Sequence, residues 1–92
     1  MKVVINRCFG GFSLSKNAYE FLGLEWDGYG YKYSDYDLRA NVELVVCVET
    51  LGEKADGYCA ELKVVEIPDD VEWEIDEYDG LESVHEVHRV WF

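Results

Sequence analysis

Basic residues are scarce in this sequence, and their scarcity excludes several classes of function. Eight Lys and Arg stand against 20 Asp and Glu, which gives a formal net charge of −12. A nucleic-acid-binding surface needs a basic footprint that neutralises phosphates, and anionic membrane surfaces also attract basic residues. The composition therefore argues against direct binding to nucleic acid and against binding to a membrane.

Long apolar runs are also lacking. No run approaches the roughly 18 residues that a membrane span requires, and the apolar stretch at residues 1–5 is too short for a secretory signal. The hydrophobic fraction is nevertheless 49%, which is enough to bury a small core. We therefore expect residues 1–92 to form a single folded domain.

Cysteines are few and do not occur in pairs. Cys8, Cys47 and Cys59 are odd in number and show no CxxC spacing. A disulfide scaffold or a structural zinc site would need paired cysteines or clustered ligands. The sequence therefore predicts a reducing compartment, the cytoplasm, in which the thiols act as small buried apolar side chains.

The first part of the chain predicts a strand, a glycine-containing loop and a helix. Residues 3–5 form a β-branched run typical of a buried strand. Ser15 is a suitable N-cap for the helix, and Gly23 is a suitable C-terminal stop. The expected apolar stripe of this helix consists of Ala18, Phe21 and Leu22.

The middle of the chain is harder to interpret. Residues 25–37 are rich in Tyr and Gly, which fits a surface loop that covers one side of the core or an aromatic contact surface. Residues 38–51 fit a helical period and a strand period equally well. We favour a helix because the run is longer than a typical strand.

The C-terminal part predicts strands. Residues 58–67 favour one strand, and residues 71–76 alternate between apolar and acidic side chains, which is typical of a half-buried strand. Asp79-Gly80 suits a two-residue type I′ turn. This turn would place Tyr78 opposite Leu81, Ile75 opposite Val84 and Glu74 opposite His85, with the return strand continuing to Trp91.

A final helix from Leu81 onward is the alternative for this return segment. With the strand interpretation, the predicted fold is α+β. About four strands form a small antiparallel sheet with a C-terminal β-hairpin, and two helices pack against this sheet.

Acidic residues are concentrated near the end of the chain. Ten of the 20 lie between Lys63 and Arg89, an interval that contains no other Lys or Arg. Side chains two residues apart on a strand share a face at roughly 7 Å intervals. This pattern predicts either a solvated face or a surface that binds a basic groove on another protein. The predicted partner-binding residues are Glu72, Glu74, Asp76, Glu77, Asp79 and Glu82.

Residue patterns for catalysis are weak. The sequence contains no GxSxG, no Walker loop and no GxGxxG after a strand. His85 and His88 would lie on opposite faces of a strand, so a metal site would have to borrow carboxylates or a cysteine. We therefore predict a non-enzymatic protein with no catalytic residues, no cofactor and no metal.

Two segments of the sequence are similar to a known protein family. Residues 5–18 (INRCFGGFSLSKNA) and 64–92 (VVEIPDDVEWEIDEYDGLESVHEVHRVWF) resemble a family of small proteins encoded by phages and prophages. Members run from a Gly-Gly-Phe loop with a capped helix to an acidic hairpin that ends in Lys-His-Arg-Thr-Trp. Here the ending is Val87-His88-Arg89-Val90-Trp91, so the Lys and Thr are missing and a phosphate contact by that Lys is in doubt.

The resemblance implies a role in phage anti-defence. One form is an acidic protein, similar to small anti-CRISPR proteins, that blocks a basic groove of a host immune effector. The alternative is similar to the Thoeris anti-defence sponges, which bind a cyclic ADP-ribose signal. Its ligand-binding residues would be Arg39, Trp73, His88 and Arg89, although Arg89 could instead form an internal salt bridge and the charge of −12 opposes an anionic ligand.

A phage housekeeping role is a further alternative. The Tyr-rich segment and the Trp91-Phe92 end would also suit a homodimer.

Overall fold

Strand β1 (Lys2–Asn6) is the most deeply buried strand of the computed structural model, which describes residues 1–87. Val4 belongs to the larger apolar cluster of the core, whereas Val3 and Ile5 belong to a smaller second cluster. Successive side chains of a strand point to opposite faces, so a strand covered on both sides needs a continuous apolar run. The predicted first buried strand is confirmed.

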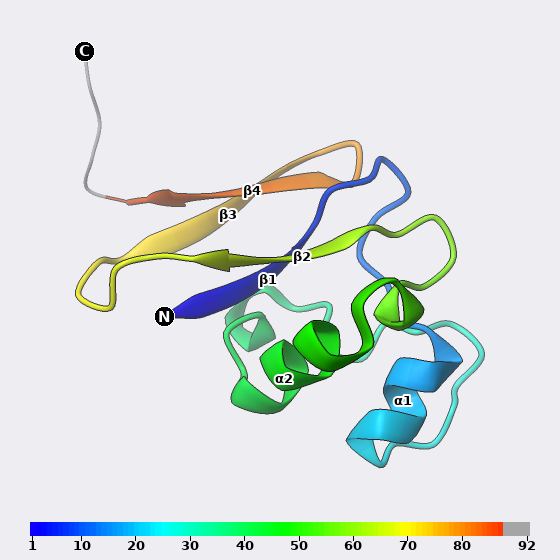
Figure 1. The fold of residues 1–92 in the computed structure, drawn as a ribbon. Coiled ribbons are helices and arrows are strands. Elements are labelled where there is room, and N and C mark those ends of the chain that lie inside the picture. The colour runs from blue at the N-terminus through cyan, green and yellow to red at the C-terminus, as the bar shows by residue number, and fades with distance from the viewer. Residues whose placement is uncertain (88–92) are drawn as a thin grey trace.

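The β1 strand pairs with β2 (Leu62–Glu66) in an antiparallel ladder, with Val4 opposite Val64. Helices α1 (Lys16–Leu22) and α2 (Val42–Leu51) lie below this pair in Figure 1, and α2 contacts both strands. The larger apolar cluster fills the space between these strands and the helices. The core of the protein therefore lies on this side of the β1–β2 pair.

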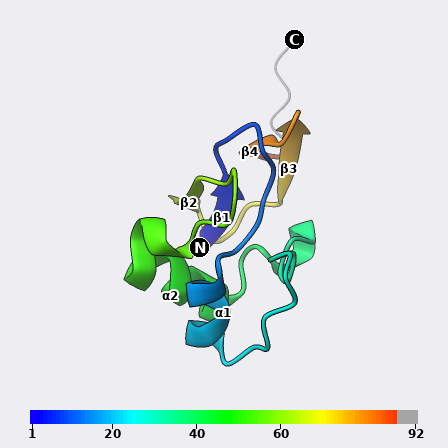
Figure 2. The same cartoon turned by 90° about the vertical axis from the view of Figure 1, so that its right-hand side faces the viewer.

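A hairpin of β3 (Trp73–Tyr78) and β4 (Leu81–Glu86) covers the other face of the β1–β2 pair (Figure 1, Figure 2). Ile75 packs there against Val3 and Ile5. Within residues 1–87, four strands thus form two antiparallel pairs and two α-helices form a separate layer. The predicted α+β class and the C-terminal hairpin are confirmed.

Both helices begin and end at local signals. The Ser15 hydroxyl accepts a hydrogen bond from the Ala18 amide at 3.1 Å, and Gly23 adopts a left-handed conformation with φ 72°. The predicted apolar stripe is wrong at Phe21, which is 43% exposed, because Tyr19 occupies the buried position of this helix instead.

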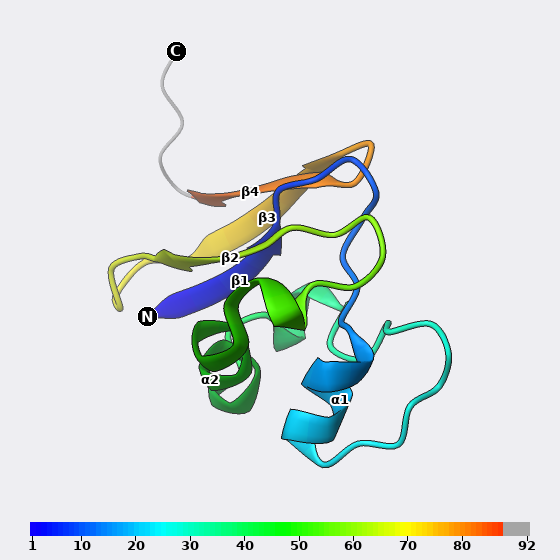
Figure 3. The same cartoon turned by 45° about the vertical axis from the view of Figure 1, so that its right-hand side comes forward.

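The second helix confirms the helical interpretation of the middle segment, with a later start than predicted. Asn41 caps α2 by accepting hydrogen bonds from the amides of Glu43 and Leu44. Residues Tyr36–Leu38 form a separate 3-10 turn, η1, and Gly52–Ala55 form a second one, η2, after α2. The segment after α1 loops away from the helices before it reaches η1 (Figure 3), so the predicted surface loop at residues 25–37 is largely confirmed.

The hairpin has the predicted register. Tyr78 pairs with Leu81, Ile75 with Val84 and Glu74 with His85. Asp79 and Gly80 both have positive φ, at 51° and 90°, as a type I′ turn requires. The strand alternative is therefore confirmed for residues 81–86, and the predicted continuation through residues 88–91 lies outside the described residues.

Gly80 also permits a close contact with the loop after β1. A Cβ atom at Gly80 would lie 2.5 Å from both the Phe9 carbonyl oxygen and the Gly11 amide nitrogen. No other residue type fits there without a shift of backbone. The hairpin turn is therefore packed against the Gly-Gly-Phe loop, which brings together the two sequence blocks of the resemblance.

Two smaller predictions need correction. The strand predicted at residues 58–67 covers only Leu62–Glu66, because the chain turns at Cys59 with φ 62°. Of the three cysteines, only Cys47 is buried, and this burial raises the pKa of its thiol. Cys8 is half-buried and Cys59 is exposed.

Among residues 1–87, no helix combines the length and apolar character needed to cross a bilayer.

Candidate functional site

The C-terminal hairpin carries charged side chains on both of its faces. Ile75 and Val84 point toward β1, so residues that share their alternation also point inward. Glu74, Asp76 and His85 have the opposite alternation and are exposed. The two faces place acidic residues in very different surroundings, and we describe them in turn.

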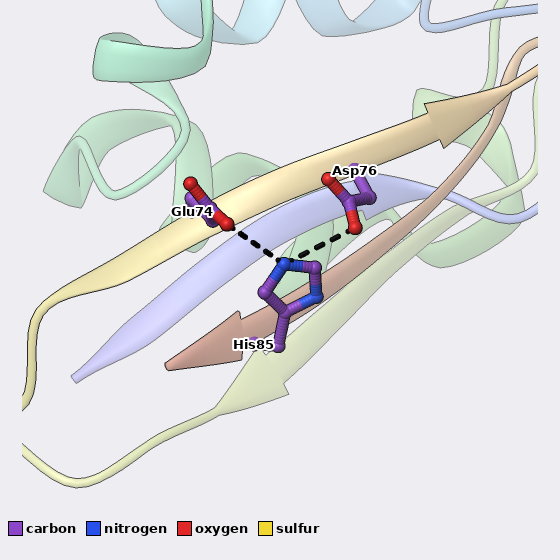
Figure 4. A group of neighbouring side chains, drawn as sticks. All are labelled: Glu74, Asp76 and His85. Atoms are coloured by element: carbon purple, nitrogen blue, oxygen red, sulfur yellow. Dashed lines mark hydrogen bonds and ion pairs between the residues drawn. The ribbon is translucent and has the colours of Figure 1, made fainter. Parts of the chain in front are cut away.

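The outer face brings together one imidazole and two carboxylates (Figure 4). His85 Nε2 lies 3.0 Å from Glu74 Oε1 and 3.1 Å from Asp76 Oδ2. The register accounts for this arrangement, because Glu74 lies directly opposite His85 and Asp76 is its diagonal neighbour on the facing strand. The three side chains are 41–68% exposed, so solvent or a binding partner has access to them.

Two further carboxylates extend this negative charge to the hairpin turn. Glu77 has the alternation of Ile75 and not that of Glu74, but it is exposed near the turn, as is Asp79, and the Glu77 Oε1 atom accepts a hydrogen bond from the Gly80 amide at 2.5 Å. We call Glu74, Asp76, Glu77 and Asp79 the acidic hairpin surface. His85 can neutralise at most one of these four charges, so the surface stays negative.

Glu82 was expected to belong to this surface, and that prediction is wrong. The residue is only 3% exposed, because it shares the alternation of Val84 and therefore points inward. Its carboxylate receives two hydrogen bonds from the Arg39 guanidinium, at 2.5 Å from Nη1 and 2.8 Å from Nη2. Glu82 therefore belongs to a buried ion pair and has no access to a partner.

The same pair changes the interpretation of Arg39, which the nucleotide-binding alternative assigns to a phosphate. Arg39 is 1% exposed, and its guanidinium carbon lies 3.8 Å from the centre of the Phe12 ring. Its nitrogens also donate to the carbonyl oxygens of Ser34 and Val4. Because every part of the guanidinium is engaged, Arg39 does not present itself to a phosphate in this structure.

The buried pair takes the place of a neighbouring strand along the free edge of β1. The Val4 amide donates to the Arg39 carbonyl at 2.8 Å, while the Val4 carbonyl accepts from the Arg39 side chain. The Asn6 amide donates to Glu82 Oε1 at 2.7 Å. An unpaired strand edge is costly when buried and prone to aggregation when exposed. Arg39 and Glu82 satisfy this edge and tie it to the hairpin.

Asn6 and Arg7 add further links between β1 and the hairpin. The Asn6 side-chain amide donates to the Gly80 carbonyl at 2.8 Å, and Arg7 Nη1 donates to the Glu82 carbonyl at 2.6 Å. The hairpin is therefore fixed to the rest of the molecule at its turn as well as along its inner face.

The remaining predicted residues lie apart from these groups. Trp73 is half-buried and packs on the smaller apolar cluster, beside a shallow groove that it lines with Tyr36, Asp37 and Glu74. Glu72 is exposed just before β3, and its carbonyl accepts from the Val87 amide at 3.0 Å. His88 and Arg89 lie outside the described residues.

The Tyr-rich segment forms a separate aromatic surface. Tyr29 and Tyr31 are exposed and stack with their ring centres 6.2 Å apart. Asp27 organises the turn before them: its Oδ1 accepts hydrogen bonds from the amides of Tyr29 and Gly30, and these bonds lower the pKa of the Asp27 carboxyl. The loop that follows α1 lies at the helical end of the molecule (Figure 3), whereas the end of the segment, at Tyr36 and Asp37, lies beside Glu74.

Sequence reasoning did not place His85 among the functional residues. The signal was nevertheless available, because the Asp79-Gly80 turn fixes Glu74 opposite His85. No protein-family model matches the chain, and neither the curated proteins nor the solved structures contain a match. The resemblance to a phage family therefore stays a prediction, and the functional argument rests on the geometry.

Proposed function

We propose that the protein is a non-enzymatic binding protein whose acidic hairpin surface contacts a basic groove of another protein. The observation that carries this proposal is the set of four exposed carboxylates on the hairpin: Glu74 and Asp76 beside the His85 imidazole, and Glu77 and Asp79 at the turn. Complementary charge accelerates association and excludes partners of like charge. The net charge of −12 extends this attraction over the whole molecule.

A nucleic-acid-binding protein is the class of partner that fits best. Glu74 and Asp76 stand two residues apart on one strand face, and their facing carboxylate oxygens lie within 4.8 Å of each other, so their negative charge is concentrated in one place. A groove that binds a phosphate backbone offers rows of Lys and Arg to such charges. If the resemblance to phage proteins holds, this partner is a host immune effector and the protein is an anti-defence inhibitor.

The anchoring of the hairpin supports this proposal. The two-residue turn, the buried Arg39–Glu82 pair and the close packing of Gly80 hold the hairpin against β1. A surface that is ordered before binding loses less conformational entropy on association. The groove beside Glu74 adds Trp73 and Tyr36, and aromatic side chains of this kind often dominate binding energy.

The test compares two variants of equal net charge. The hairpin variant carries Glu74→Gln, Asp76→Asn, Glu77→Gln and Asp79→Asn. The control variant carries Glu20→Gln, Glu25→Gln, Glu53→Gln and Glu61→Gln, all at exposed positions outside the hairpin. Proteins that the wild type captures from a bacterial lysate are identified by mass spectrometry. Each complex is then rebuilt from purified components and titrated.

The expected result is a stoichiometric complex from which added nucleic acid displaces the protein. Its affinity should fall at least tenfold when salt rises from about 50 to about 300 mM. The hairpin variant should lose most of the affinity and the control variant should keep it. A complex that responds equally to both variants, or no reconstituted complex at all, would refute the proposal.

A further inference from the structure

We propose that Glu74, Asp76 and His85 form a binding site for a divalent transition-metal ion, with Zn²⁺ as the representative ion. Their ligand atoms, the two carboxylate oxygens and one imidazole nitrogen, all lie within 4.8 Å of one another. One imidazole nitrogen with two carboxylate oxygens is a donor set that suits Zn²⁺ and its neighbours. This inference goes beyond the proposed function and needs no partner protein.

The distances fit a coordinated ion. Zn²⁺ binds nitrogen and oxygen ligands at about 2.0–2.2 Å, so neighbouring ligands of a tetrahedral site lie about 3.3–3.5 Å apart. His85 Nε2 lies 3.0 Å and 3.1 Å from the two carboxylate oxygens. These two distances lie within a few tenths of an ångström of that spacing, and the two carboxylate oxygens lie within 4.8 Å of each other, so side-chain movements would bring all three atoms around an ion.

The direction of the imidazole ring distinguishes this group from an ordinary acidic cluster. His85 points its Nε2 atom between Glu74 and Asp76, so that one nitrogen faces both carboxylates (Figure 4). An imidazolium, with protons on both ring nitrogens, carries a single positive charge, whereas a divalent ion would balance both carboxylates and leave the imidazole neutral. A divalent ion in this position therefore neutralises both carboxylates, whereas a protonated His85 neutralises only one of them.

The backbone holds the three ligands in register before any ion binds. Glu74 and Asp76 lie on β3, and His85 lies on β4 of the same two-stranded ladder. The side chains are 41–68% exposed, so water can complete the coordination. A site with an imidazole ligand favours Zn²⁺ over Mg²⁺, which prefers oxygen ligands and retains its own waters.

The experiment is calorimetric titration of the full chain with ZnCl₂ and, separately, with MgCl₂. Zn²⁺ should bind with a stoichiometry of one at this site, and His85→Gln should weaken binding at least tenfold. Glu74→Gln should also weaken it. In NMR spectra recorded during the titration, the backbone amide signals of β3 and β4 should shift first.

Two control variants test whether side chains outside this site bind the ion. Glu20→Gln removes an exposed carboxylate on α1, and Cys59→Ser removes an exposed thiol. Both should bind Zn²⁺ like the wild type. The proposal is overturned if His85→Gln leaves the affinity unchanged, if Cys59→Ser abolishes binding, or if Mg²⁺ binds as tightly as Zn²⁺. None of these outcomes depends on the partner complex, so the two proposals fail independently.

Discussion

Glu82 and Glu74 belong to the same short hairpin, and each contacts a basic side chain, but they lie on opposite faces. Glu82 is almost fully buried against Arg39, whereas Glu74 meets His85 in contact with solvent. In the buried pair every charged atom must find a partner, because water cannot replace a missing one. On the exposed face water replaces lost contacts, which leaves the carboxylates free to exchange partners. One hairpin thus combines a structural ion pair with a surface suited to binding.

The largest expected effect comes from breaking the buried pair. Glu82→Gln leaves the Arg39 charge without a counter-charge in the protein interior. We expect the free energy of unfolding to fall by about 3–5 kcal/mol, measured by urea denaturation. That is a large part of the total stability of a domain of this size.

A second variant keeps this prediction testable if the single variant does not fold. Replacing both partners, as Arg39→Met with Glu82→Met, removes the uncompensated charge and should be less destabilising than Glu82→Gln alone. A cost below about 1 kcal/mol for Glu82→Gln would mean that the pair does not hold β1 to the hairpin.

Substitutions of the ion-paired residues on the outer face should change the free energy of unfolding much less. A double-mutant cycle with Glu74→Gln and His85→Gln, in buffer containing a chelator, should give a coupling energy of about 1 kcal/mol or less. Added salt should reduce this energy, because exposed charges are screened. The matched cycle at Arg39 and Glu82 should keep its coupling energy in high salt. Equal salt sensitivity of the two cycles would remove the distinction between the faces.

The smallest expected effect concerns Asp27, which is exposed like Glu74 but is fully engaged by backbone amides. These hydrogen bonds lower the pKa of the Asp27 carboxyl from its ordinary value of 3.8. Its ionised form therefore stabilises the folded state above the unfolded pKa, and this contribution disappears as the pH falls through the lower, folded pKa.

Asp27→Asn should consequently be less stable than the wild type near neutral pH, and the difference should shrink in acid. Urea midpoints measured from about pH 7 to about pH 2.5 would follow this change. A difference that stays constant across this range would show that the amide hydrogen bonds do not depend on the charge.

Much of the fold could be predicted because its signals are local. Ser15, Gly23 and the Asp79-Gly80 turn act through their nearest neighbours in the sequence, and each does what its residue type favours. The register of the hairpin, including Glu74 opposite His85, follows from that turn. The candidate metal ligands were therefore within reach of sequence reasoning.

The errors have a common cause. Phe21 lies on the expected apolar stripe but is exposed, and Tyr19 is buried because other segments supply its surroundings. The Tyr19 hydroxyl donates to Asp27 and accepts from the Lys32 amide, which satisfies the polar atom inside the core. Such partners are distant in the sequence, and no local pattern predicts them.

The sequence by itself determined the strong negative charge, the limits of α1 and the pairing within the hairpin, since each depends on composition or on residues a few positions apart. Only the tertiary structure decided which carboxylates face solvent. Glu82 looks like its acidic neighbours until Arg39, 43 residues earlier in the chain, lies beside it. Whether a charge is buried depends on where distant segments meet, and that is a property of the folded chain.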